Sequence, residues 1–359
     1  MLKAGIVGCG KIADSHVEQL RATGRAEVRA VCDSEELMAE QLATRMRIPR
    51  CYTDLAEMLK TEQLDVVHIA TPPSSHLAIA RQAMQAGCHV FIEKPFALHA
   101  DQTREILDIA NALSRHVGVN YLYNFEFPAL ELERLLADDK LGQIVHLDCS
   151  YGYNLGGDYG LAVLSDPAHW VHSLPGKLFH NVLDHVLAKI VFAISEQAEV
   201  QVVALRRRPA TGNASIDGMR DELRVLLRDG DVTATCVVSA HARPVAHSLR
   251  VVGTQDTVDI DYAARTLLFA ARQTQPSAVG RLMPAWAQAR QYRRNGRRNL
   301  GEFRRHEFHY FQGMRVLLNR YYDSVAGTAS APISATDIMR VSRLTDRIVA
   351  AIDASGGLS

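Results

Sequence analysis

The sequence predicts an α/β protein: an N-terminal Rossmann doubly wound parallel sheet, then a C-terminal α+β domain with a large, mainly antiparallel open sheet. Two observations lead to this prediction. In the first 120 residues, short apolar runs alternate with amphipathic stretches, as in parallel strands joined by crossover helices. In the second half, strand-like runs follow one another across short turns, as in antiparallel sheets. We place the boundary near Asn120 and expect domains over residues 1–120 and 121–359.

The expected strands of the first domain are apolar on both faces, so helices must cover both sides of their sheet. These strands are Ala4–Val7, Val28–Cys32, Val66–Ala70, Val90–Ile92 and Val117–Val119. Amphipathic stretches over Ser34–Met46 and His76–Ala86 predict two of the covering helices. The second helix has Ser74 and Ser75 as candidate N-caps and ends at Gly87.

The second domain contains five strand-like runs: Gln143–Ser150, Val200–Leu205, Glu222–Leu227, Val232–Ser239 and Leu249–Val252. Turn signals at 228–231 and 253–256 predict hairpins. We expect one helix from about Leu178 to Ile194 and a last helix from Ala335 to Ala354.

Composition argues against several classes of protein. The 359 residues carry 40 basic and 40 acidic side chains, a balance that argues against a general nucleic-acid binder. The chain opens without a signal-peptide pattern, and no run approaches about eighteen consecutive apolar residues, so we expect a cytoplasmic protein without a membrane span. The six cysteines are scattered and form no CxxC pair, and we expect reduced thiols.

A dinucleotide-binding pattern follows the first expected strand. Gly8 and Gly10 allow a tight turn and a close approach to a pyrophosphate at a helix N-terminus, and Ala13 allows close helix–strand packing. Asp33 ends the second strand, where a carboxylate binds the ribose hydroxyls and repels a 2′-phosphate. The pattern therefore favours NAD as cofactor over NADP.

Two further segments follow strands at the carboxyl edge of the predicted parallel sheet, where such sheets bind ligands. One is 70–76, which contains Thr71, Pro72 and His76, and the other is Glu93-Lys94-Pro95. A lysine at this edge can polarise a substrate hydroxyl or carbonyl oxygen, and burial lowers the pKa of its ammonium.

These residues together resemble the Gfo/Idh/MocA family of NAD(P)-dependent oxidoreductases, with Glu93-Lys94-Pro95 as the most specific element. The resemblance covers nearly the whole chain, since Pro332–Gly357 is similar to the last helix of that family. It implies cofactor contacts at Gly8, Gly10, Lys11, Ile12, Asp33, Thr71, Pro72, His76, Glu93 and Lys94. It also implies a cis peptide bond between Lys94 and Pro95.

The family carries an aspartate and a histidine four residues apart at the start of a helix in its second domain. His185 matches the family histidine, the usual acid–base candidate, whereas Asn181 stands in place of the aspartate. An asparagine hydrogen-bonds a hydroxyl but carries no charge. His180 and Asp184 form a second pair at the same spacing, so Asp184 is an alternative source of a carboxylate.

Other side chains have two readings of similar weight. His169 and Trp170 are either a stacking surface for a sugar ring or ordinary loop packing. Tyr121, Tyr123 and Asn124 are either substrate contacts or core residues. Although four histidines lie within residues 169–185, no cysteine or carboxylate completes a tetrahedral set nearby, and we expect no metal.

We therefore expect an NAD-dependent oxidoreductase that converts a sugar, polyol or nucleotide-sugar hydroxyl to a carbonyl, with Lys94 polarising the oxygen and His185 as acid–base. The resemblance leaves two alternatives open: a redox-neutral sugar lyase, epimerase or glycosidase that uses NAD, or a non-catalytic NAD-binding sensor. It also implies a homodimer or homotetramer.

The segment Arg281–Arg305 departs from this pattern because it contains eight arginines and a single acid, Glu302. Apolar residues interleave with the arginines, which predicts an amphipathic helix interrupted near Gly296 and Gly301. Its role is either that of a solvated or subunit-facing helix or that of a binding surface. As a binding surface it would take the diphosphate of a nucleotide sugar or make peripheral contact with an anionic membrane.

Overall fold

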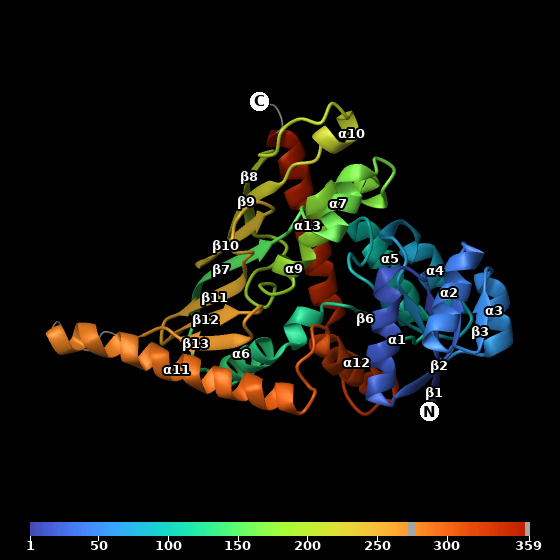
Figure 1. Cartoon of the computed structure of the whole chain (residues 1–359), viewed down its shortest axis with the longest axis horizontal. Coiled ribbons are helices and arrows are strands. Elements are labelled where there is room, and N and C mark those ends of the chain that lie inside the picture. Colours follow the sequence, from blue (N-terminus) through green and yellow to red (C-terminus); the bar gives the residue numbers. More distant parts are fainter. Residues whose placement is uncertain (272–276, 356–359) are drawn as a thin grey trace. The chain divides into compact units, whose positions relative to one another are not determined.

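The computed structural model describes residues 1–271 and 277–355 and divides the chain into two compact units. The first comprises Met1–Leu122 with Phe311–Asp346, and the second comprises Tyr123–Tyr310 with Arg347–Ser359 (Figure 1). Gly356 and Gly357, at the end of the stretch Pro332–Gly357 that resembles the family, lie outside the described residues.

A six-stranded parallel sheet forms the core of the first unit, which confirms the predicted Rossmann architecture. Its strand order is β3-β2-β1-β4-β5-β6. The strands are β1 Leu2–Val7, β2 Ala26–Cys32, β3 Arg50–Tyr52, β4 Val66–Ile69, β5 His89–Ile92 and β6 Val117–Val119. The chain order reverses between β1 and β4, and in such sheets ligands bind at the carboxyl ends of the strands beside this reversal.

Helices cover both faces of this sheet. They are α1 Lys11–Thr23, α2 Glu36–Met46, α3 Leu55–Glu62, α4 His76–Gln85, α5 Ala100–Ala112 and α12 Gln312–Val325, with the short 3₁₀ turn η1 Pro73–Ser75. Ser75 occupies the N-cap position of α4, but its hydroxyl lies 2.9 Å from the Pro72 carbonyl oxygen and 2.7 Å from the Thr71 hydroxyl. The capping bond expected from the sequence is therefore absent at Ser75.

A seven-stranded sheet dominates the second unit, as predicted. Its order is β13-β12-β11-β7-β10-β9-β8, and every neighbouring pair is antiparallel except β7 with β10. The strands are β7 Ile144–Gly152, β8 Glu199–Leu205, β9 Glu222–Asp229, β10 Val232–Ser239, β11 His247–Gly253, β12 Thr257–Asp261 and β13 Thr266–Phe269. Both predicted hairpins form, β9 with β10 and β11 with β12.

The remaining helices are η2 Leu122–Phe125, α6 Phe127–Ala137, α7 Asp158–Ser165, η3 Trp170–Ser173, α8 Lys177–Val182, α9 Asp184–Leu187, α10 Ala214–Asp217, α11 Ala278–Arg304 and α13 Ala335–Ser355. Two expectations for this region are wrong. The helix expected over 178–194 ends at Leu187, as α8 and α9, and is followed by turns, and α11 continues without interruption through Gly296 and Gly301.

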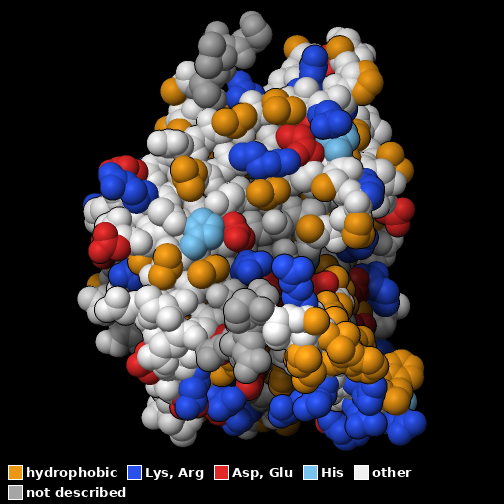
Figure 2. Space-filling model, turned by 90° about the vertical axis from the view of Figure 1, so that its left-hand side faces the viewer, with side chains coloured by type: hydrophobic (Ala, Val, Ile, Leu, Met, Phe, Trp, Pro, Cys, Tyr) orange, Lys and Arg blue, Asp and Glu red, His pale blue; other side chains and the backbone are white. Residues whose placement is uncertain are grey.

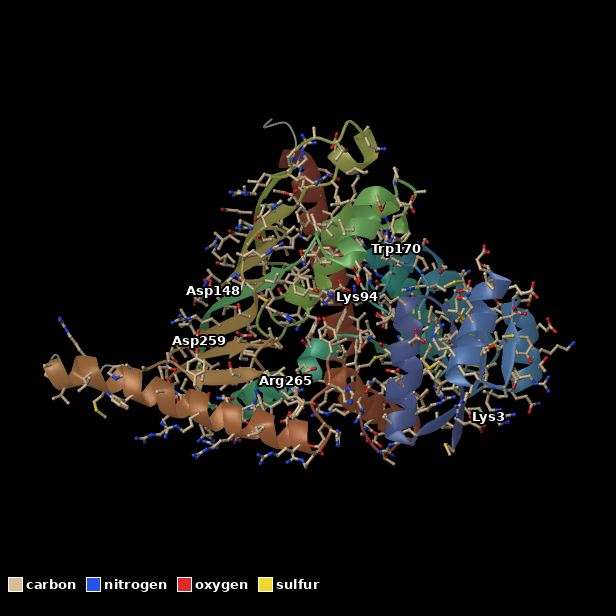
Figure 3. The ribbon with its side chains drawn as sticks, viewed as in Figure 1. Lys3, Lys94, Asp148, Trp170, Asp259 and Arg265 are labelled. Atoms are coloured by element: carbon tan, nitrogen blue, oxygen red, sulfur yellow. The ribbon has the colours of Figure 1, made fainter. Side chains whose placement is uncertain are left out.

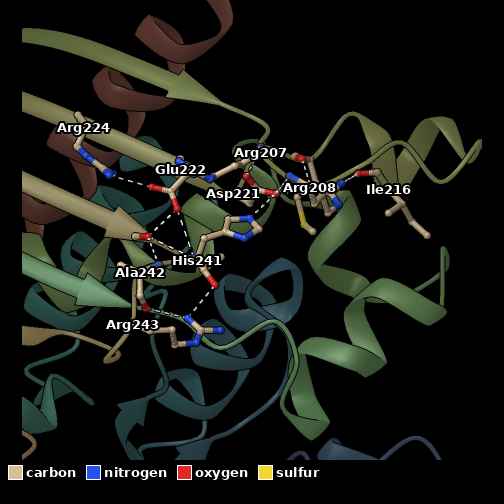
Figure 4. A network of polar contacts seen from close by, with 12 residues as sticks. Arg207, Arg208, Ile216, Asp221, Glu222, Arg224, His241, Ala242 and Arg243 are labelled. Atoms are coloured by element: carbon tan, nitrogen blue, oxygen red, sulfur yellow. Dashed lines mark hydrogen bonds and ion pairs between the residues drawn. The ribbon is translucent and has the colours of Figure 1, made fainter.

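A polar network closes one end of the second sheet, where the loop between β8 and β9 returns (Figure 4). The Asp221 carboxylate accepts hydrogen bonds from the backbone of Arg207 at 2.7 Å and of Arg208 at 3.1 Å, and lies 3.2 Å from His241 Nε2. Burial acts to raise the pKa of Asp221, but these donors lower it overall. The buried carboxylate therefore holds its loop as an anion.

Candidate active site

The glycine turn after β1 has the shape required for a dinucleotide phosphate. Gly8 has a φ of 92°, and a Cβ there would lie 2.7 Å from the Ala70 carbonyl carbon and the Thr71 nitrogen. Gly10 is the N-cap of α1 and faces open space, since a Cβ there would meet nothing within 4 Å. Lys11 and Ile12 begin the helix. An anion can thus approach the free N–H groups of α1, which fits the pyrophosphate of NAD.

Asp33 follows β2, and donors on both sides hold its carboxylate. One oxygen accepts a hydrogen bond from the Cys9 backbone at 2.7 Å, and the other accepts one from the Glu35 backbone at 3.0 Å. The carboxylate is therefore fixed against the glycine turn. Its position suits an acceptor for ribose hydroxyls.

His76 is fully buried at the start of α4 and supports two loops at the sheet edge. Its Nε2 lies 2.8 Å from the Thr71 carbonyl oxygen, and its Nδ1 lies 3.1 Å from the Phe96 carbonyl oxygen. Burial lowers the pKa of His76, which favours the neutral ring. The neutral ring has one N–H, so it donates to one of these two carbonyls. It packs between the loop that carries Thr71 and Pro72 and the loop that carries Lys94.

Glu93 is held by a buried hydrogen-bonded chain behind Lys94. Its Oε1 lies 2.8 Å from His16 Nε2 and accepts from Asn120 Nδ2 at 2.5 Å. The chain continues from His16 to His68, 3.0 Å away, and on to the Tyr322 hydroxyl at 2.9 Å. Although burial acts to raise the pKa of Glu93, its hydrogen bonds with His16 and Asn120 lower it overall.

Lys94, labelled in Figure 3, stands directly after this anchored carboxylate. Glu93 Oε2 accepts a hydrogen bond from the Lys94 backbone nitrogen at 3.2 Å. The Lys94–Pro95 peptide bond is cis, as the resemblance implied. Glu93, Asn120 and His76 thus fix the backbone from which the Lys94 ammonium extends.

In the second unit, α8 and α9 carry the other expected residues. His180, Asn181 and Asp184 are buried, whereas His185 is only half-buried. Although α8 and α9 are assigned separately, the Leu183 and Leu187 nitrogens donate to carbonyls four residues earlier. The helical path is thus continuous, and Asn181 and His185 keep the expected four-residue spacing on one face.

Tyrosine rings surround the His185 ring. The ring centroid of His185 lies 4.6 Å from that of Tyr151 and 5.1 Å from that of Tyr123. Tyr123 also contacts His247 edge-on at 4.3 Å, and His247 stacks on Tyr262 at 4.7 Å. The sequence left Tyr123 as either a substrate contact or a core residue. The structure places its ring in this aromatic cluster beside His185.

Lys189 lies beneath His185 and was not singled out from the sequence. Its ammonium is buried, donates to the His185 carbonyl oxygen and lies 2.7 Å from His247 Nε2. The same nitrogen lies 4.6 Å from the centroid of the Tyr262 ring, with Tyr123 and Tyr151 at 5.3 and 5.8 Å. Burial lowers the pKa of Lys189 from 10.5 to about 8. The available signal was its position four residues after His185, in an otherwise apolar segment.

The structure also gives contacts of Asn124, Tyr121 and the His169–Trp170 pair. The Asn124 amide donates to the Ala188 carbonyl oxygen at 2.7 Å, and Tyr121 is buried. His169 and Trp170 stack on each other at 5.6 Å. Among residues 1–271 and 277–355, no group of three or more His, Cys, Asp or Glu side chains is arranged to hold a metal, and no helix is long and apolar enough to cross a bilayer.

The sequence matches two domain families of one superfamily. Residues 2–121 match the oxidoreductase family with an NAD-binding Rossmann fold, and residues 129–259 match the GFO/IDH/MocA C-terminal domain. These two matches cover both the parallel sheet with its glycine turn and most of the second sheet. The chain belongs to the Gfo/Idh/MocA family of oxidoreductases.

Curated relatives match over part of the chain. D-glucoside 3-dehydrogenase of Escherichia coli is 31% identical over 144 residues, which are 40% of this chain and 41% of the relative. Alpha-N-acetylgalactosaminidase of Shewanella oneidensis is 26% identical over 164 residues, which are 43% of this chain and 36% of the relative. The match thus spans about two fifths of the length of these relatives.

Solved structures share the fold over almost the full length. An NAD-binding oxidoreductase from Klebsiella pneumoniae superposes with a TM-score of 0.78 at 21% identity, covering 99% of this chain and 97% of that one. The WlbA dehydrogenase from Bordetella pertussis, solved with NADH and UDP-GlcNAcA, gives 0.76 at 17% identity, covering 99% and 96%. At these identities the likeness concerns the fold.

Proposed function

We propose that this protein is an NAD-dependent oxidoreductase that interconverts a CH–OH group and a carbonyl group on a sugar, polyol or nucleotide sugar. The observation that carries the proposal is Lys94, which follows an anchored carboxylate at the carboxyl edge of a Rossmann sheet. In an unrelated α/β protein, a lysine after a strand needs no buried chain of His16, His68 and Asn120 to fix its neighbour. Such a chain is the expected support for a catalytic group.

The residues of the first unit would hold the cofactor. Gly8 and Gly10 receive the pyrophosphate, Asp33 accepts from the ribose hydroxyls, and the Thr71–Pro72 loop lies along the same edge. When bound, the nicotinamide supplies an acceptor or donor of hydride. The charge on Asp33 favours NAD over NADP because a 2′-phosphate would meet a fixed anion.

Lys94 and His185 have different roles at the reacting oxygen: Lys94 stabilises its charge, and His185 transfers its proton. In oxidation, the Lys94 ammonium stabilises negative charge on that oxygen, and His185 takes the hydroxyl proton as the carbon gives up hydride. In reduction, His185 returns the proton to the oxygen while Lys94 again stabilises its charge. Lys189 is a positioning residue, since its ammonium holds the His185 carbonyl and lies against the two tyrosines that touch the His185 ring.

The substrate class rests on the comparisons and on the tyrosine cluster. D-glucoside 3-dehydrogenase acts on a sugar derivative by its name, and the WlbA structure holds a nucleotide sugar. Aromatic faces with nearby polar atoms, such as Tyr123 and Tyr151 beside His185, suit the alternating apolar and hydroxyl surfaces of a sugar ring.

Thermal-shift screening with NAD present tests this proposal, using free sugars, sugar acids and nucleotide sugars as three separate panels. A ligand that raises Tm only with NAD present identifies the class of substrate. The reason is that a ligand that binds the folded chain, and not the unfolded one, stabilises the fold. The hit should then produce NADH in an absorbance assay. A carbohydrate that binds but gives no NADH, and is itself unchanged, would contradict the proposal.

A redox-neutral reaction is the second candidate, because the chain also resembles a named glycosidase. Such a reaction would cleave or epimerise the sugar with no net NADH. Product analysis of the same incubations separates the two, since a changed sugar without accumulated NADH supports this candidate. NAD binding without turnover on any panel would instead support a sensor.

A further inference from the structure

Helix α11 buries its polar side and exposes its apolar and basic side, the reverse of an ordinary surface helix. Its inward-facing residues are Gln288, Gln291, Asn295, Arg298 and Glu302, spaced by three and four residues. Its outward stripe, defined as Val279, Leu282, Met283, Trp286, Arg290, Arg293, Arg297 and Arg304, repeats at similar spacings on the opposite side. Two questions follow: what pairs with the buried polar side chains, and what contacts the exposed apolar and basic ones.

The inward face pairs with the edge of the second sheet. Gln291 accepts from the Phe269 nitrogen at 2.8 Å, and both Gln288 and Gln291 donate to the Phe269 carbonyl at 3.0 Å. Asn295 donates to the Leu267 carbonyl at 3.1 Å. These amides supply the partners that a further strand would otherwise provide to β13, so α11 covers the sheet edge.

Two charged contacts lock the C-terminal half of α11 in this position. Arg265, labelled in Figure 3, bonds Glu302 at 2.9 Å and lies 3.5 Å from Glu126, the N-cap residue of α6. Arg298 donates to the Arg265 carbonyl and lies over the Phe127 ring, 3.4 Å from its centroid. Arg298 and the only acid of the helix, Glu302, are therefore committed to the fold, and the outward stripe retains its positive charges.

The outward stripe is segregated along the helix. Val279, Leu282, Met283 and Trp286, in the first turns, are each more than half exposed, and the four arginines follow on the same side. The first turns project beyond the second sheet (Figure 1), and Figure 2 shows a hydrophobic cluster low on that side of the molecule beside Lys and Arg side chains. An exposed apolar cluster of this kind, next to concentrated charge, indicates a binding surface.

We propose that the outward stripe of α11 binds the surface of an anionic lipid bilayer. Leu282, Met283 and Trp286 enter the headgroup boundary, and Arg290, Arg293 and Arg297 contact lipid phosphates. Arginine suits this role because its guanidinium makes bidentate contacts with phosphate. The inference does not depend on the catalytic proposal.

Pairing with the α11 helix of a second copy fits the outward stripe less well. Parallel pairing of two α11 helices places arginine against arginine, and antiparallel pairing places arginines against apolar residues. Neither arrangement offers an anion, because Glu302 is buried with Arg265. An anionic bilayer supplies both the apolar boundary and the negative charge.

Vesicle co-sedimentation of the full chain tests this inference, using phosphatidylcholine with phosphatidylglycerol against phosphatidylcholine alone. We expect binding to the anionic vesicles, weakened as salt rises from about 0.1 M to about 1 M because the Debye length falls from about 10 to about 3 Å. Each cation near such a surface contributes about fivefold, so Arg290→Gln/Arg293→Gln/Arg297→Gln should weaken binding about a hundredfold. Leu282→Gln/Trp286→Gln should weaken it independently.

Matched controls come from exposed residues elsewhere in the second unit. Arg207→Gln/Arg228→Gln/Arg250→Gln removes the same charge from the same unit, and Val203→Gln removes an exposed apolar side chain from β8. Both controls should bind vesicles as the unmodified chain does. Equal loss in the controls, or no binding to anionic vesicles, would overturn the inference. So would a Leu282→Gln/Trp286→Gln variant that loses self-association in light scattering but keeps vesicle binding.

Discussion

In the first unit the buried carboxylate of Glu93 is bonded to His16 and Asn120, whereas in the second unit the buried ammonium of Lys189 lies among a carbonyl, a histidine and three tyrosine rings. None of these neighbours of Lys189 carries a negative charge. The pKa of Glu93 is lowered despite burial, and the pKa of Lys189 falls to about 8 because of burial. Glu93 is thus held as a permanent anion that fixes a backbone, while Lys189 titrates close to neutral pH.

The two clusters show that a buried group can either keep its charge or lose it readily, depending on its partners. Donors aimed at a carboxylate outweigh its loss of hydration, so the group becomes part of the scaffold. Cation–π contacts and neutral acceptors stabilise an ammonium only partly, so it remains ready to lose its proton. Groups of the second kind are frequent near catalytic residues.

Lys94→Ala gives the largest expected effect, because it removes the group that the Glu93 cluster supports. Turnover should fall by about two to four powers of ten, since a charged donor at the reacting oxygen is lost, while NAD binding stays nearly intact. Steady-state kinetics and NAD titration measure both quantities. Lys60→Ala, at an exposed position of α3, is the control, and unchanged turnover in Lys94→Ala would contradict the assigned role.

The pH dependence of stability distinguishes the two buried charges directly. Lys189 has a folded pKa of about 8 against an ordinary 10.5, so between these values the unfolded chain binds more protons and stability rises with pH. Relative to Lys189→Met, the unmodified protein should gain up to about 3 kcal/mol from pH 7 to pH 10.5. Urea unfolding at each pH measures this difference.

Glu93→Gln is the matched contrast, since Glu93 is ionised in both the folded and the unfolded chain above pH 7. Its destabilisation, about 2 kcal/mol for a lost charged hydrogen bond, should be constant across the same range. The comparison would be wrong if the difference in unfolding free energy between Lys189→Met and the unmodified protein did not change with pH. It would also be wrong if that difference changed with pH for Glu93→Gln.

His185→Ala should lower kcat/KM about a hundredfold or more, the loss expected for a general acid–base. His180→Ala should mainly lower Tm, because that side chain is buried in α8. If Asp184 replaces the family aspartate, Asp184→Asn will be nearly as damaging to kcat/KM as His185→Ala. An inactive His180→Ala together with an active His185→Ala would show that α8 and α9 have been misaligned with the family.

The smallest expected effect concerns Asp33, a second carboxylate of the first unit that is fixed by donors. NAD should bind about tenfold or more tightly than NADP, because the 2′-phosphate would lie against a fixed negative charge. Asp33→Asn keeps an acceptor for the Cys9 nitrogen but removes the negative charge. The ratio of the dissociation constants of NADP and NAD should therefore fall in this variant. Dissociation constants that favour NADP in the unmodified chain would refute the preference.

Features that depend only on residues close together in the chain could be predicted from the sequence. The strands of the parallel sheet and both hairpins follow from apolar runs and turn residues, and the turn at Gly8 follows from its glycine spacing. The short strand β3 was missed because its three residues carry too little periodicity. Strand β13 pairs along one side with β12 and along the other with α11 side chains, an arrangement that no local pattern predicts.

By itself the sequence determined the family, the cofactor turn, the glutamate–lysine pair and the presence of an arginine-rich helix. The tertiary structure decided which of these charges are permanent, since that depends on partners far away in the chain: His16 and Asn120 for Glu93, and His247 and Tyr262 for Lys189. It also decided which face of α11 is outward. Free energies of burial and pairing depend on distance and solvent access, and these are set only when remote segments come together.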